Sequence, residues 1–137
     1  MKKVITILML MVAIVVGSQT ASADTVETAL MSGSVGKYKV KMKLWRNLDN
    51  NTVTGWYYYT SKGANNKIKL SGRILPQDED NFFFCDMVLT ETVNGKVTGT
   101  FRGSYGYGMM TGDDFEGTWT SPQGKSLHFE VNGGGRP

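Results

Sequence analysis

The sequence predicts an all-β protein, an antiparallel up-and-down meander of seven or eight strands that closes into a barrel. Beyond residue 23, apolar and polar residues alternate at period two along most of the chain, and no helical stripe interrupts them. Short turn signals such as Asn94-Gly95 separate the alternating segments, as in hairpin-connected sheets. An open sandwich is the alternative, and we prefer the barrel because closure removes exposed sheet edges.

Each expected strand carries an apolar row that faces the core. In residues 35–46 the apolar positions Tyr38, Val40, Met42 and Leu44 alternate with a row of lysines. This row, Lys37, Lys39, Lys41 and Lys43, forms a linear positive stripe that could bind an anion, but such a row is more typical of a solvated outer face. The expected strands are 35–46, 53–60, 67–75, 82–91, 96–104, 114–121 and 126–132. Polar or glycine-rich turns separate them at 49–51, 61–66, 76–81, 94–95, 105–112 and 122–124.

The first 23 residues have the pattern of a cleaved secretory signal peptide. A basic start, Lys2-Lys3, precedes an uncharged apolar run of 14 residues from Val4 to Gly17, and Ala21-Ser22-Ala23 fits the cleavage pattern. The apolar run is shorter than the roughly 20 residues that a membrane-spanning helix needs. We therefore expect an exported protein, periplasmic or extracellular, with no stable membrane insertion after cleavage.

The remaining 114 residues suit a single domain. Residues 24–34 form an N-terminal segment that supplies an eighth strand or a short helix, residues 35–132 form the barrel, and residues 133–137 form a flexible tail. Without the two signal-peptide lysines, 13 basic side chains face 12 acidic ones, a net charge of +1, so we expect no nucleic-acid partner. The only cysteine, Cys85, cannot form an internal disulfide, and its apolar neighbours predict a buried, inert thiol.

Three strands repeat one pattern, in which an apolar residue, a glycine and an aromatic residue share one face. The repeats are Val53-Thr54-Gly55-Trp56-Tyr57, Val97-Thr98-Gly99-Thr100-Phe101 and Phe115-Glu116-Gly117-Thr118-Trp119. The glycine leaves room for a large neighbouring ring or for a tightly curved strand. If this face points inward, the repeats aim large rings into the barrel.

Longer motifs around these repeats resemble those of a known group of proteins. They are Val53-Thr54-Gly55-x-Tyr57-Tyr58-Tyr59, Val97-Thr98-Gly99-x-Phe101-x-Gly103 and Phe115-x-Gly117-Thr118-Trp119-Thr120. In them the chain is similar to small exported bacterial proteins, many from Bacteroidetes. The resemblance implies a barrel of the lipocalin or avidin type and brings no established activity. The chain departs from the group at 77–81 and 105–110, so function at the level of these loops can differ.

The inward phase suggests a ligand site at the barrel mouth. Tyr57, Tyr59 and Trp119 carry polar tips on inward-facing rings, and Glu91 supplies a carboxylate near a strand end. These four residues could hold a small apolar, aromatic or glycan ligand, with residues 105–110 as a lid. The alternative is that the rings fill the barrel, satisfy one another's polar atoms, and leave Glu91 at a solvated rim.

The outward phase suggests an interaction surface. Trp56 and Tyr58 point away from the core, and Phe82 and Phe84 join them if the Leu89-x-Glu91 element sets the phase of its strand. That phase places Phe83, Cys85, Met87 and Leu89 inside. An outer aromatic patch indicates a protein or glycan contact, for example with a cell-wall or host enzyme that the protein inhibits. Cover by the N-terminal segment or by a second copy is the alternative.

The sequence offers little catalytic chemistry, so we expect a binding protein rather than an enzyme. The single histidine, His128, alternates onto the outer face of the last strand. No nucleophile elbow, phosphate-binding glycine loop or metal-spaced His/Cys set occurs in the sequence. The acidic clusters at 78–80 and 113–114 do not match a defined calcium loop. We therefore expect no cofactor and no metal.

Overall fold

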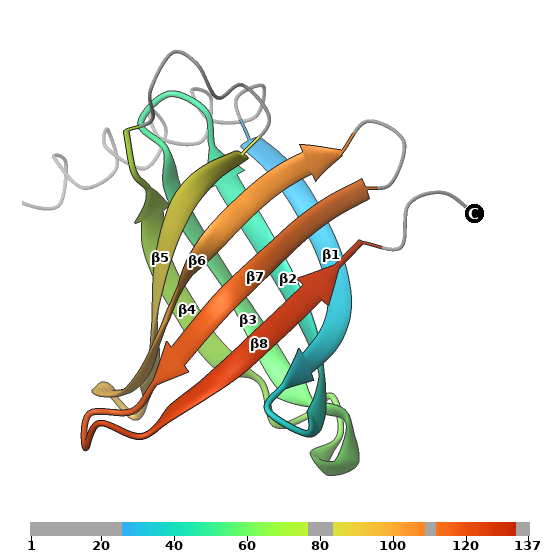
Figure 1. Ribbon diagram of the computed structural model, residues 1–137, viewed down its shortest axis with the longest axis vertical. Coiled ribbons are helices and arrows are strands. Elements are labelled where there is room, and N and C mark those ends of the chain that lie inside the picture. Colours follow the sequence, from blue (N-terminus) through green and yellow to red (C-terminus); the bar gives the residue numbers. More distant parts are fainter. Residues whose placement is uncertain (1–25, 77–83, 109–111, 134–137) are drawn as a thin grey trace, which may run out of the picture.

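Eight antiparallel strands close into one barrel in the computed structural model, which describes residues 26–76, 84–108 and 112–133 (Figure 1). Each strand pairs with the next along the chain, and the first strand pairs with the last. The strands are β1 (Val26–Val35), β2 (Tyr38–Asn47), β3 (Thr52–Tyr59), β4 (Ile68–Ile74), β5 (Phe84–Val93), β6 (Lys96–Gly108), β7 (Gly112–Thr120) and β8 (Ser126–Asn132). A single-turn 3₁₀ helix, η2 (Thr60–Lys62), follows β3.

The N-terminal segment completes the barrel as its eighth strand. Four residues of β1, Ser32 to Val35, pair with Phe129 to Asn132 of β8, and this pairing removes the last open edge. The predicted all-β meander and its closure are therefore confirmed. The barrel begins at Val26 rather than at residue 35, and the helix considered for residues 24–34 does not form from Val26 onward.

Two turns differ in how well the sequence locates them. Asn94 and Gly95 adopt φ angles of 53° and 80°, which is the left-handed pair that a two-residue type I′ hairpin requires, as predicted. The strand predicted over residues 35–46 is instead interrupted near its start, because Gly36, with φ of 59°, turns the chain from β1 into β2. The predicted linker 105–112 is also shorter, since β6 continues to Gly108.

The core follows the predicted inward phase except at Val97, which the repeat placed with Gly99 and Phe101 but which is 53% exposed, next to a register shift between Glu91 and Thr92. Tyr57, Phe101, Phe115 and Phe129 are completely buried, and the three phenylalanines pack edge to face at 4.6–5.0 Å between ring centroids. In β5 the inward set is Cys85, Met87 and Leu89, as predicted, whereas Phe82 and Phe83 lie outside the described residues. Tyr38 was expected inside but is 50% exposed. It begins β2 at the rim, where its ring meets the edge of Tyr59.

Glycines on the inward phase leave room for large rings inside the barrel and let neighbouring strands approach each other closely. A Cβ at Gly99 would overlap the indole of Trp119, with Cζ2 at 2.7 Å. Gly103 and Gly117 face each other across β6 and β7, so a side chain at either one would strike the backbone of the other strand. Both roles expected for the repeated glycine therefore occur.

The barrel has two unlike ends. At the lower end in Figure 1 the strands are joined by the connections 36–37, 60–67, 94–95 and 121–125. At the upper end β1 begins and β8 ends, and the connections following β2, β4 and β6 leave the barrel there. The candidate sites lie at opposite ends of the interior.

Candidate functional site

Four of the inward side chains form one hydrogen-bonded network near the lower end, and Glu91 is its centre. Tyr57 donates to Glu91 Oε1 at 2.5 Å, and the indole N–H of Trp119 donates to the same oxygen at 3.0 Å. Thr98 donates its hydroxyl to Oε2 at 2.7 Å. Glu91 is only 4% exposed, so these donors compensate the carboxylate for lost water.

The network has a fixed direction of hydrogen bonding. Burial raises the pKa of Tyr57 above its ordinary value, and the bond to Glu91 raises it further. Tyr57 therefore keeps its proton and donates at any physiological pH. The hydroxyl of Tyr59 lies 3.4 Å from that of Tyr57 and extends the network toward the half-buried rim.

The structure thus brings together the four residues expected to bind a ligand, and it adds Thr98. Their polar atoms bond to one another, and the ring of Tyr57 packs edge-on against Phe101 at 5.1 Å. Both observations match the alternative in which these rings fill the barrel. Residues 105–108 of the expected lid lie in β6 near the opposite end, because Tyr105 pairs with Phe115 whereas Glu91 pairs with Gly99. The remaining residues of that expected lid, 109–110, lie outside the described residues.

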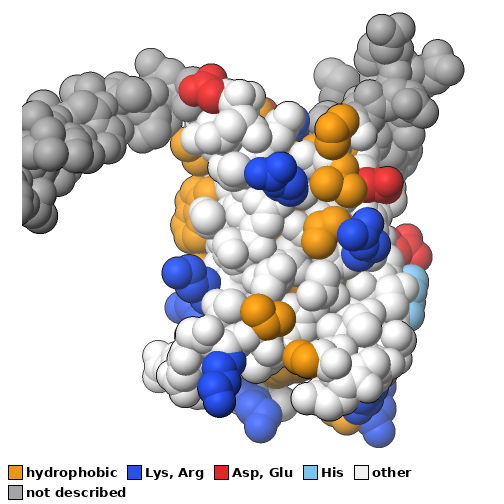
Figure 2. Space-filling model, turned by 90° about the vertical axis from the view of Figure 1, so that its left-hand side faces the viewer, with side chains coloured by type: hydrophobic (Ala, Val, Ile, Leu, Met, Phe, Trp, Pro, Cys, Tyr) orange, Lys and Arg blue, Asp and Glu red, His pale blue; other side chains and the backbone are white. Residues whose placement is uncertain are grey.

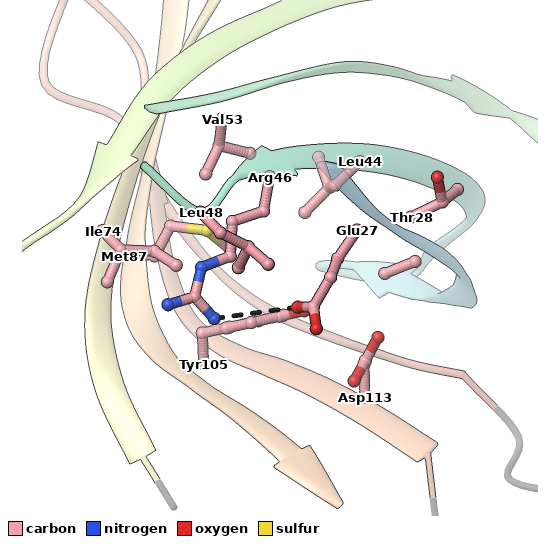
Figure 3. A pocket seen from close by; sticks show the side chains of 11 residues that line it. Glu27, Thr28, Leu44, Arg46, Leu48, Val53, Ile74, Met87, Tyr105 and Asp113 are labelled. Atoms are coloured by element: carbon pink, nitrogen blue, oxygen red, sulfur yellow. Dashed lines mark ion pairs between the residues drawn. The ribbon is translucent and has the colours of Figure 1, made fainter. Parts of the chain in front are cut away.

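A pocket of about 390 Å³ occupies the interior at the upper end (Figure 3). Six of its lining side chains are aliphatic and five are polar, and they come from β1 to β7 and from the turn after β2. The lining residues are Glu27, Thr28, Ala29, Leu44, Arg46, Leu48, Val53, Ile74, Met87, Tyr105 and Asp113. An eight-stranded barrel is just wide enough for one small ligand, and this volume is within the range of ligand pockets.

The polar side chains of the pocket converge from four strands, β1, β2, β6 and β7. Arg46 of β2 lies 3.9 Å from Glu27 of β1 and donates a 3.1 Å hydrogen bond to Asn51, and Figure 3 shows Glu27, Arg46, Tyr105 and Asp113 around the same space. Burial raises the pKa of Asp113, and the charge of Glu27 adds to this. Burial likewise raises the pKa of Tyr105, as does the charge of Asp113.

Sequence reasoning missed this pocket, although a signal was present. Arg46 continues the inward phase of Met42 and Leu44, and Asp113 continues that of Phe115 and Gly117. A charged residue on the inward phase near a strand end therefore indicates a polar group in the barrel mouth. The same rule had singled out Glu91, at the other end. Glu27 could not be placed because its segment was not assigned to a strand.

The expected outer aromatic surface is described only in part. Trp56 and Tyr58 lie on the outer face of β3, as expected, and their rings stack at 5.8 Å. Phe82 lies outside the described residues, and β5 begins at Phe84, whose side chain is likewise outside them.

One group of potential metal ligands lies on the outer wall. Glu116 of β7 is directly opposite Glu130 of β8, and His128 approaches Glu116 at 3.4 Å. Their ligand atoms lie within 4.8 Å of one another, but all three side chains are exposed. In water, carboxylates and imidazole keep their hydration, so this arrangement alone does not define a site.

The comparisons with known proteins add no relative. No protein-family model, no curated protein and no solved structure matches this chain. Among the described residues, no helix has the length and apolar character needed to cross a membrane.

Proposed function

We propose that this protein is an exported, non-enzymatic binding protein whose upper-end pocket holds a small amphipathic molecule. One observation carries the proposal: the barrel is filled with rings at the lower end but leaves about 390 Å³ open at the upper end. A chain that needed only a stable core would fill this space with side chains, because packing stabilises the folded state. The signal-peptide pattern of residues 1–23 supports export.

The lining suggests the chemistry of the ligand. Leu44, Val53, Ile74 and Met87 offer an apolar wall for an aliphatic or aromatic body. Arg46, Tyr105 and Asp113 offer donors and an acceptor to a polar end group at the mouth. Such a ligand gains from burial of its body and is oriented by its polar end. This site replaces the lower-end network as the preferred binding position, since Glu91 already has three donors.

A matched pair of substitutions on β1 tests the position of the site. Ala29 lines the pocket and is 6% exposed, whereas its neighbour Leu30 points outward and is 62% exposed. Ala29→Phe should fill the pocket, and Leu30→Phe should not. The readouts are fluorescence of bound 1-anilinonaphthalene-8-sulfonate, which has an apolar body and a charged end, and native mass spectrometry of protein purified from a periplasm.

We expect wild type and Leu30→Phe to bind the probe with equal affinity. The affinity of Ala29→Phe for the probe should be lower by at least about tenfold. Circular dichroism must show that both variants keep the fold. Equal probe binding by all three proteins would reject the upper pocket as the binding site.

A further inference from the structure

Positive charge is concentrated on one part of the barrel's outer wall, with Asp86 of the neighbouring strand β5 exposed beside it. Six cations project outward from β2 and β4 and from the residue preceding β4, and no acidic side chain projects from the same strands. We define the basic face by these cations and the aromatic residues among them: Lys39, Lys41, Lys43, Trp45, Trp56, Tyr58, Lys67, Lys69 and Arg73. The net charge of the whole chain is only +3, so the face reflects placement rather than composition.

Acidic side chains gather on the other side of the barrel. Asp114, Glu116 and Glu130 are exposed on the outer faces of β7 and β8. Figure 2 views the barrel from the side where β4 lies, and it shows Lys and Arg side chains spread from top to bottom, with acidic ones near the upper and right edges. The field of the basic face attracts an anionic partner to that side of the molecule.

Aromatic rings lie within the basic face. Trp56 is paired with Lys43 on one side and with Lys69 on the other, so a ring stands between two cations in one row across three strands. The two lysines are about 10 Å apart at the backbone, two strand spacings. Lys67 lies 4.8 Å from the centre of the Trp56 ring, and Tyr58 stacks beside it. A partner that fits this row has negative groups on either side of a flat apolar surface.

We propose that the basic face binds an acidic polysaccharide. A sugar ring presents a C–H face that packs on an indole, and the carboxylates or sulfates of the same chain reach lysines on either side. The proposal concerns a site on the outer wall and is independent of the pocket. It also identifies a use for the outward residues Trp56 and Tyr58 that differs from a protein contact.

Two other anionic partners fit less well. Five of the six cations are lysines, whereas nucleic-acid recognition favours the planar fork of arginine. A membrane-docking face needs apolar side chains that protrude, but Trp45, Trp56 and Tyr58 are only partly exposed, and the Lys43 ammonium lies 5.1 Å from the centre of the Trp45 ring.

The test measures binding of the whole exported chain to polygalacturonate, a carboxylated polysaccharide, by affinity electrophoresis at several salt concentrations. Hydroxyethylcellulose is the uncharged counterpart. Single-stranded oligothymidylate and phosphatidylglycerol-containing vesicles represent the other two partner classes. The double variant Lys43→Gln/Lys69→Gln and the single variant Trp56→Ala alter the central row. The double variant Lys96→Gln/Lys125→Gln removes the same charge from exposed positions outside the face.

We expect polygalacturonate binding that weakens with salt and no binding of hydroxyethylcellulose. The Lys43/Lys69 variant should lose about tenfold in affinity and the Lys96/Lys125 variant less than about twofold, because only the former pair flanks Trp56. Trp56→Ala should weaken binding at high salt as well, since stacking is not screened. Equal loss in both lysine variants, no retardation by polygalacturonate, or tighter binding of the oligonucleotide or the vesicles would overturn the proposal.

Discussion

Tyr57 and Glu91, which are 34 residues apart in the sequence, are joined by a hydrogen bond inside the barrel. Their side chains are 0% and 4% exposed, and the same carboxylate also accepts from Thr98 and Trp119. One glutamate therefore ties β3, β6 and β7 to β5 across the lower end. Polar groups on inward-facing rings suggest a ligand site when only the sequence is known. Here those of Tyr57 and Trp119 bond to Glu91 and help to pack the lower end of the barrel.

The first prediction concerns Glu91 itself. Glu91→Ala leaves three donors without their acceptor and opens a cavity, so we expect the free energy of unfolding to fall by about 3 kcal/mol or more. The control is Glu116→Ala, which removes an exposed glutamate from the outer wall and should change stability by less than about 0.5 kcal/mol. Urea denaturation followed by tryptophan fluorescence measures both. Equal effects would show that the buried network contributes nothing.

The second prediction separates the role of Tyr57 in packing from a role in ligand binding. Tyr57→Phe keeps the ring against Phe101 but removes one donor from Glu91, so it should lower the free energy of unfolding by about 1–2 kcal/mol. Binding of 1-anilinonaphthalene-8-sulfonate should stay unchanged, because Tyr57 does not line the upper pocket. If Tyr57→Phe kept wild-type stability but no longer bound the probe, the binding site would lie at the lower end instead.

The third prediction tests the fit between Gly99 and Trp119. A Cβ at Gly99 would overlap the indole, and the ring is held in place by its hydrogen bond to Glu91. Gly99→Ala should therefore cost about 1–3 kcal/mol through overpacking and shift the tryptophan emission. Thr100→Ala changes the next residue, which points to the outer face, and should cost little. An unchanged emission spectrum together with unchanged stability would mean that the ring has room to move.

Period-two alternation was enough to predict the strands and their inward faces, because one face of each strand must be buried and a one-residue shift would expose the whole row. The barrel was preferred to an open sandwich because closure removes exposed sheet edges. The phase of β5 followed from Leu89 and Glu91 for the same reason, and the left-handed pair Asn94-Gly95 marked its own turn. The turn between Val35 and Tyr38 was harder to predict from the sequence. A single glycine, Gly36, turns the chain there between two segments whose alternation reads as continuous.

The sequence identified the residues of the lower-end network but did not show whether they bind a ligand or fill the barrel. Alternation shows that Tyr57, Glu91 and Trp119 point inward, but their common position depends on four pairings among the five strands β3 to β7. Whether a cluster of polar rings surrounds a space or fills it depends on distances that no spacing in the sequence contains. The pocket was missed because Arg46 and Asp113 converge with Glu27, whose strand was not assigned.

The last prediction uses the pH dependence of stability to test the environment of Asp113. Burial raises the pKa of this carboxyl in the folded state above its ordinary value of 3.8. The folded protein therefore holds the proton at pH values where the unfolded chain has released it, and stability is lost as pH rises from about 3.8 through the folded pKa. Asp113→Asn cannot ionise, so this loss should be absent from the variant.

The variant should accordingly gain stability relative to wild type as pH rises through that window, with a constant advantage above it. Urea unfolding over a pH series measures the difference between the two proteins. A hydrogen bond with Tyr105 holds the pKa of Asp113 down, so Tyr105→Phe should extend the window of wild-type loss to higher pH. A difference between wild type and Asp113→Asn that does not change with pH would show that Asp113 is as well solvated in the pocket as in the unfolded chain.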